Sequence, residues 1–96
     1  MGWNDAQPPF KKTYQATDTA DLIVKNKPGY LHAIIVGKYD ENASIEVSDH
    51  ATDGDGNVKI FLEGATVGTH LVQAEFTVGI TADLISGPQR VTFIWK

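Results

Sequence analysis

Lys27-Pro28-Gly29-Tyr30-Leu31-His32-Ala33-Ile34-Ile35-Val36-Gly37 is the stretch of the chain that decides its fold. Proline fixes φ for a turn, and glycine accepts the positive φ that such a turn needs. The turn leads directly into branched and aromatic side chains, which favour the pleated surface of a β-sheet. Because apolar character is nearly continuous over 30–37, we expect a strand that is buried on both faces.

Short segments of strand character, separated by turns, continue on both sides of this run. Ile45 and Val47 alternate with polar residues and are expected to point inward. Phe61 and Ile94 point opposite to the other apolar residues of their strands, so we expect them on an outer face. Seven strands at this spacing indicate a β-sandwich or a small barrel. The expected strands are 21–25, 30–37, 44–48, 58–62, 70–78, 80–85 and 91–95.

Residues 1–19 differ from the remainder of the chain, residues 20–96, which we expect to form the β-domain. The segment holds two consecutive prolines, which favour an extended conformation, and three widely spaced aromatic residues, Trp3, Phe10 and Tyr14. It is either a frayed terminus or an extended N-terminal arm that packs on a neighbouring molecule. We prefer the arm, because disordered segments are typically poor in aromatic residues.

The composition of the chain limits the classes of partner and site that it can have. Its 96 residues are 42% hydrophobic, which is enough for one core, and they include no cysteine, so neither a disulfide nor a thiolate metal site is available. A net charge of −4 disfavours nucleic-acid binding. No apolar run approaches the roughly 20 residues of a membrane-spanning helix. Small domains of this kind often gain stability by binding a larger partner or each other.

Motifs that would indicate metal binding or catalysis are weak or missing in this sequence. The loop from Asp49 to Asn57 places carboxylates in a spacing similar to that of a calcium loop, but the glycine and the final acid of that motif are missing, which favours a plain turn. The three histidines are widely separated, so no zinc site is expected. No nucleophile elbow, phosphate loop or zinc-protease motif occurs, and we expect neither catalysis nor a cofactor.

The excess of outward apolar side chains instead indicates an interface. Aromatic residues are enriched at the centres of protein interfaces. We therefore predict five contact residues, which are Trp3, Phe10, Tyr14, His32 and Phe61.

The order of the segments resembles that of small virion proteins of tailed bacteriophages. The first shared motif is "G-x-L-H-x-I-x-V", which corresponds here to residues 29–36, and "s-I-x-v-x-D" follows at 44–49. A "G-x-x-I" strand is matched by residues 56–60, with one additional residue between Gly56 and Ile60, and an "F-x-x-G-L-x" turn is matched by 76–81, where Ile80 replaces leucine. The last motif, "v-T-v-x-Y/W", corresponds to residues 91–95. The resemblance covers about 22–95 and leaves the N-terminal segment outside.

This resemblance implies an antiparallel, jelly-roll-like β-sandwich on the outside of a virion, made in the host cytoplasm. The implied function is that of a capsid decoration (cement) protein, which binds the major capsid protein and is commonly a homotrimer. Two alternatives stay open. One is a tail-associated or head-fibre module. The other is a carbohydrate- or receptor-binding sandwich, for which Tyr30, Tyr39 and Trp95 are candidate stacking residues.

Overall fold

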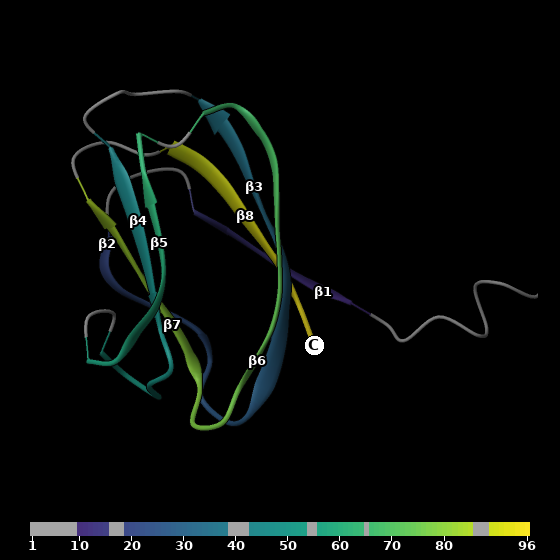
Figure 1. The fold of residues 1–96 in the computed structure, drawn as a ribbon, viewed down its shortest axis with the longest axis vertical. Helices are drawn as coiled ribbons and strands as arrows, with labels where there is room; N and C mark the ends of the chain where they lie inside the picture. The colour runs from purple at the N-terminus through teal and green to yellow at the C-terminus, as the bar shows by residue number, and fades with distance from the viewer. Residues whose placement is uncertain (1–9, 16–18, 39–42, 54–55, 65, 86–88) are drawn as a thin grey trace, which may run out of the picture.

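The protein is an all-β sandwich of two four-stranded antiparallel sheets (Figure 1). The computed structural model describes residues 10–15, 19–38, 43–53, 56–64, 66–85 and 89–96, and in these ranges it contains eight strands and no helix. The strands are β1 (Lys11–Gln15), β2 (Thr19–Lys25), β3 (Gly29–Lys38), β4 (Ser44–Ser48), β5 (Val58–Glu63), β6 (Gly68–Phe76), β7 (Ile80–Ile85) and β8 (Gln89–Trp95).

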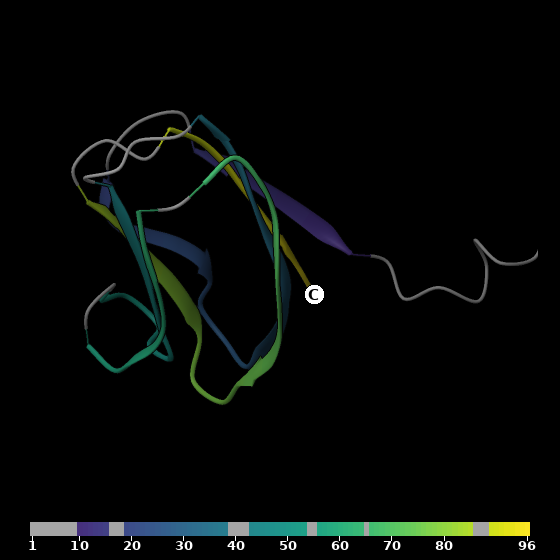
Figure 2. The same ribbon diagram turned by 45° about the horizontal axis from the view of Figure 1, so that its top comes forward.

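The strand order has a regular pattern. The first sheet has the order β1-β8-β3-β6 and the second sheet has the order β2-β7-β4-β5. Strands therefore pair as β1 with β8, β2 with β7, β3 with β6 and β4 with β5. Apart from the β4–β5 connection, every connection passes from one sheet to the other, so the two layers face each other throughout (Figures 1 and 2).

The core lies between the sheets and consists of the inward side chains of the interior strands. Ile45 and Val47 of β4 are fully buried, as their alternation predicted. On β3 a register shift between Leu31 and Ala33 interrupts the alternation. The expected burial on both faces is found only in part, because Ala33 is buried while Ile35 stays partly exposed. The buried core cluster is Val24, Leu31, Ile34, Val36, Ile45, Val47, Phe76, Ile80, Ala82, Leu84, Val91 and Phe93.

Two expectations about the strands are corrected. The strand count is eight rather than seven, because 11–15, which we placed in the arm, pairs with β8 as strand β1. The strand expected over 70–78 ends at Phe76, and Val78 is exposed rather than inward. The cause is a carboxylate that redirects the backbone just after Phe76.

That carboxylate belongs to Asp49, which is buried at the end of β4. It accepts hydrogen bonds from the Thr77 hydroxyl (2.9 Å) and from the backbone N–H groups of Thr77 (3.0 Å), Val78 (2.7 Å) and Gly79 (3.3 Å). Burial alone would raise its pKa, but these four hydrogen bonds favour the ionised form and lower the pKa of Asp49 to about 2. Asp49 thus fixes the turn that passes from the first sheet to the second.

The loop after Asp49 is held in the same way. Nδ1 of His50 accepts the backbone N–H groups of Thr52 (3.1 Å) and Asp53 (2.9 Å). The His50 carbonyl accepts the hydroxyl of the buried Thr81 at 2.7 Å. A Cβ atom at Gly79 would lie 2.8 Å from this carbonyl oxygen, so only glycine fits there. His50 therefore has a structural role.

Candidate binding surface

The outer face of the first sheet carries exposed apolar and aromatic side chains among the polar ones that are usual on a solvated sheet face, such as Lys12, Thr69 and Glu75. The register fixes which residues share this face. Ala33 pairs with Ile94 on one side and with Leu71 on the other, and Ile35 pairs with Thr92, which in turn pairs with Tyr14. Leu71 is 65% exposed and Tyr14 is 58% exposed. This surface, called the aromatic face below, comprises Phe10, Tyr14, Tyr30, His32, Ile35, Leu71 and Ile94.

Three aromatic rings form a cluster at one end of the aromatic face. The rings of Phe10 and His32 are stacked with centroids 4.8 Å apart, and Tyr30 lies 6.4 Å from both. Nζ of Lys96 lies 5.5 Å from the Phe10 centroid and 5.6 Å from that of Tyr30, in cation–π contact with both. The cluster connects β1 to β3, although these strands are not neighbours in the sheet.

The outer face of the second sheet has a different chemistry. Glu46 of β4 lies directly opposite Asp83 of β7 and, on its other side, opposite Phe61 of β5. Desolvation of Asp83, together with the negative charges of Glu46, Asp21 and Asp53, raises the pKa of this carboxyl. This surface, called the acidic face below, is defined by Asp21, Glu46, Phe61, Glu63 and Asp83.

The structure brings together some of the predicted contact residues and separates others. Phe10 and His32 are in direct contact, and Tyr14 lies on the same aromatic face. Phe61 is 51% exposed, as its phase in the strand predicted, but it lies on the acidic face of the other sheet. Trp3 lies outside the described residues. No single surface therefore holds the whole predicted set.

Leu71 and Ile35 were not among the predicted contacts. The outward position of Leu71 follows from the regular alternation of β6, in which Val72, Ala74 and Phe76 are the more buried residues. The same period-two alternation in the sequence could therefore have identified Leu71 as an outward residue. Ile35 was obscured because it stands in an unbroken apolar run.

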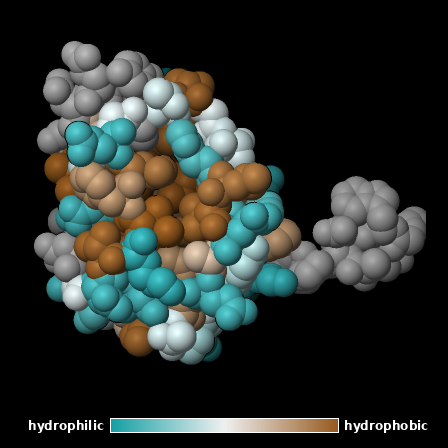
Figure 3. Space-filling model, in the orientation of Figure 1, coloured by the Kyte–Doolittle hydropathy of each residue, from teal (hydrophilic) through white to brown (hydrophobic). Residues whose placement is uncertain are grey.

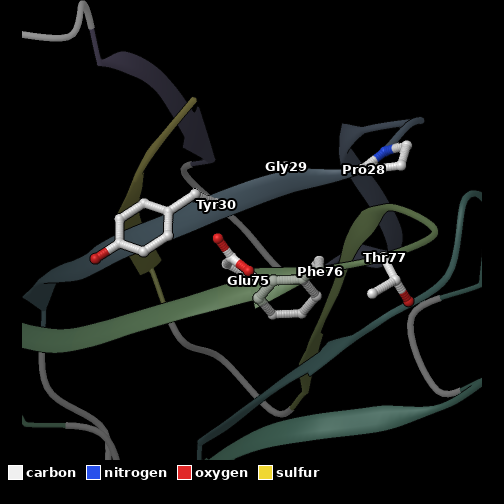
Figure 4. Close-up of a pocket in the computed structure, with 6 residues that line it drawn as sticks. All are labelled: Pro28, Gly29, Tyr30, Glu75, Phe76 and Thr77. Carbon is white, nitrogen blue, oxygen red and sulfur yellow. The ribbon is translucent and has the colours of Figure 1, made fainter.

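A shallow hollow of about 490 Å³ lies beside the aromatic cluster (Figure 4). Its wall consists of Pro28, Gly29 and Tyr30 at the start of β3 and of Glu75, Phe76 and Thr77 at the end of β6. Phe76 is buried, and the Thr77 hydroxyl already donates to Asp49. The accessible polar groups are therefore few, and the Glu75 carboxylate is the main one.

The stacking residues considered for a carbohydrate site do not form one platform. Tyr30 lies on the aromatic face, whereas Trp95 packs against the core from the inner side of the same sheet. Nε1 of Trp95 donates to the Thr13 hydroxyl at 2.9 Å, and Lys11 and Lys25 lie over its ring. Tyr39 lies outside the described residues.

In the described ranges, no three His, Cys, Asp or Glu side chains come together as metal ligands. These ranges also contain no helix with the length and hydropathy of a membrane span.

Comparisons with known proteins add no family: no protein-family model matches the chain, and no curated protein is similar to it. Its surfaces are therefore the basis for any functional proposal.

Proposed function

We propose that this chain is a non-enzymatic structural protein of a tailed-bacteriophage virion. In this proposal it is a capsid decoration (cement) protein that binds the outside of the head, contacts the major capsid protein and stabilises the joints between capsid subunits. The aromatic face is the observation that carries the docking part of the proposal, because exposed apolar side chains gathered on one sheet face are typical of a protein that binds another one. The assignment to a virion rests on the resemblance of residues 22–95.

We further propose that the sandwich is a jelly roll. The strand order supports this, because the chain forms four antiparallel pairs that alternate between the two sheets. The pairs β1/β8 and β3/β6 lie in the first sheet, and the pairs β2/β7 and β4/β5 lie in the second. Two Greek-key units folded onto each other give this type of order. The resemblance of residues 22–95 to phage virion proteins supports the same fold.

The proposed contact with the capsid uses the aromatic face. The side chains of Leu71 and Tyr14 project from a rigid sheet, so they can be buried against a partner with little loss of backbone entropy. Binding to the folded state alone would also raise the apparent stability of this cysteine-free domain by mass action. The N-terminal segment, with Trp3, is proposed to add further contacts.

Co-sedimentation with phage heads tests the proposal. Heads that lack their decoration protein are mixed with the wild type, with Leu71→Lys and with Ile23→Lys. Ile23 is the matched control, because it is 47% exposed on β2 of the other sheet. We expect Leu71→Lys to weaken binding at least about tenfold, as for a residue at an interface centre, and Ile23→Lys to bind like the wild type.

Circular dichroism of both variants establishes that they are folded. If the wild type binds no heads, the decoration role is wrong. Binding to tails, or to glycans on an array, would instead support the tail-associated or the carbohydrate-binding alternative.

A further inference from the structure

Strand β5 is an edge strand whose burial is incomplete. It is the outermost strand of the second sheet, so in the described structure one side of its backbone has no strand beside it. Its inward residues Ile60 and Leu62 are only partly buried, whereas the residues opposite them on β4, Val47 and Ile45, are fully buried. In Figure 3 apolar side chains gather in the middle of the view, where Figure 1 places the gap between β5 and β6.

The other three edge strands have features that oppose pairing with another chain. β2 contains two register shifts, and β6 contains one, with Gln73 at a φ of 52°. β1 has two lysines and no carboxylate. Bulges and lysines are the usual protection of sheet edges. β5 also contains a register shift, with Lys59 as its extra residue, but this shift lies at the start of the strand, and the four residues Ile60–Glu63 beyond it pair regularly with β4.

The sequence of β5 is complementary to itself in the antiparallel direction. Consider a second copy of Lys59-Ile60-Phe61-Leu62-Glu63 related by a two-fold axis at Phe61. Phe61 then lies opposite Phe61 of the second copy, and Ile60 opposite its Leu62. Lys59 lies opposite Glu63 of the second copy at each end. Aromatic, aliphatic and opposite-charge pairs are the cross-strand pairs that stabilise a sheet.

We propose that two copies of this chain pair through their β5 edges and form a two-fold dimer. The two second sheets then join into one continuous eight-stranded sheet, which satisfies the free backbone groups of both edges. Ile60 and Leu62 become covered on the side where the single chain leaves them partly exposed. The contact is isologous, so it closes on itself and does not grow into a fibre.

The charge pattern of this surface favours the edge over the acidic face as the place of self-contact. Glu46 and Asp83 already oppose each other on that face, and stacking two such faces would add like charges. At the β5 edge the two-fold instead places an ammonium opposite a carboxylate at both ends. In the single chain Nζ of Lys59 donates to the Glu75 carbonyl at 2.7 Å, so Lys59 exchanges this acceptor for Glu63 of the second copy.

This dimer does not depend on the proposed virion function, because it forms from the purified protein alone. Its symmetry also differs from the trimer that the resemblance implies. A contact of one strand edge buries less than the ~1,200 Å² of a stable complex, so we expect dimerisation in the micromolar to millimolar range.

A charge exchange tests the proposal. Sedimentation velocity over this concentration range is measured for the wild type, Lys59→Glu, Glu63→Lys and the double variant. Each single change places like charges opposite each other, and we expect it to weaken dimerisation at least about tenfold. The double variant restores opposite charges at both ends, and its dimerisation should return to within about threefold of the wild type.

A second pair of variants keeps the test independent of Lys59, which also bonds to β6. Phe61→Thr should weaken the dimer as strongly as Glu63→Lys does, while Ile23→Thr, at a similarly exposed apolar position on β2, should leave it unchanged. A wild type that stays monomeric up to millimolar concentration would overturn the proposal. So would a double variant as weak as the single ones, or a trimer that none of these changes affects.

Discussion

The aromatic face and the acidic face are built from the same kind of antiparallel sheet but carry opposite chemistry. On the aromatic face, Ala33 lies between Leu71 and Ile94, and a cation covers the adjoining rings. On the acidic face, two carboxylates oppose each other in the middle of the sheet. Exposed apolar side chains favour association, whereas opposed like charges cost stability. On the second sheet the exposed Ile23 and Phe61 lie beside these opposed carboxylates, so the aromatic face offers the more favourable surface for a protein contact.

The turn between β6 and β7, which connects the two sheets, is held by the Asp49 carboxylate. The loss of this carboxylate is expected to have the largest effect on stability. Asp49→Asn keeps one oxygen acceptor and replaces the other by a donor, so backbone N–H groups of residues 77–79 lose their partner. We expect a loss of about 3 kcal/mol in the free energy of unfolding, because a buried charged acceptor is removed. Urea denaturation measures it. Thr77→Val, which removes only the hydroxyl donor, should cost about 1 kcal/mol.

The same carboxylate predicts how stability depends on acid. The pKa of Asp49 lies near 2 in the folded protein, below the ordinary value of 3.8. The unfolded chain therefore binds the proton more tightly, and the stabilisation is complete above about pH 5 and lost as the pH falls toward 2. A difference of this size corresponds to about 2 kcal/mol. The unfolding free energy, measured by denaturation at several pH values between 2 and 6, should change less with pH for Asp49→Asn than for the wild type. An equal pH dependence of the two proteins would contradict this prediction.

A smaller effect is expected at β1, the edge strand of the first sheet. The indole N–H of Trp95 donates to the Thr13 hydroxyl, and this bond connects β1 to β8. Thr13→Val removes the acceptor and should cost about 1 kcal/mol in unfolding free energy. Amide hydrogen exchange in β1 should then be faster in the variant than in the wild type, and this increase should be larger in β1 than in β3. Unchanged exchange in β1 would mean that pairing with β8 holds this strand without the side-chain bond.

The smallest effect on stability is expected on the acidic face, where removing a charge should stabilise the protein rather than destabilise it. Because the pKa of Asp83 is raised in the folded state, its protonated form favours folding, and this contribution is lost as the pH rises through the raised pKa. Asp83→Asn should therefore stabilise the protein at pH 7 by about 0.5 kcal/mol, and by less near pH 3. Thermal denaturation at low and high salt measures it, since salt screens the repulsion. A destabilised variant at pH 7 would contradict the repulsion between Asp83 and Glu46.

Much of this fold could be predicted from the sequence. Period-two alternation identified the inward Ile45 and Val47 and the outward Phe61, because side chains in a strand point to alternate faces. β1 was missed because Lys-Lys-Thr-Tyr-Gln has no apolar alternation, and its strand character comes from pairing with β8. The end of β6 was missed because it depends on Asp49, which lies 28 residues away from Thr77.

The candidate surface was less predictable than the fold. Phe10 and His32 were both expected as contacts, but their stacking follows from a strand order that places β1 and β3 on either side of β8. The separation of Phe61 from these residues has the same origin, since β5 belongs to the other sheet. Strand spacing along a sequence does not determine how strands are distributed between two sheets.

Hydroxyl-radical footprinting of the protein with and without phage heads tests the central claim most directly, because it reports the solvent exposure of individual side chains. We predict that Phe10, Tyr14 and Leu71 on the aromatic face become protected when heads are added, while Ile23 on β2 keeps its reactivity. Protection of Ile23 with unchanged Tyr14 and Leu71 would contradict the claim that the aromatic face is the docking surface.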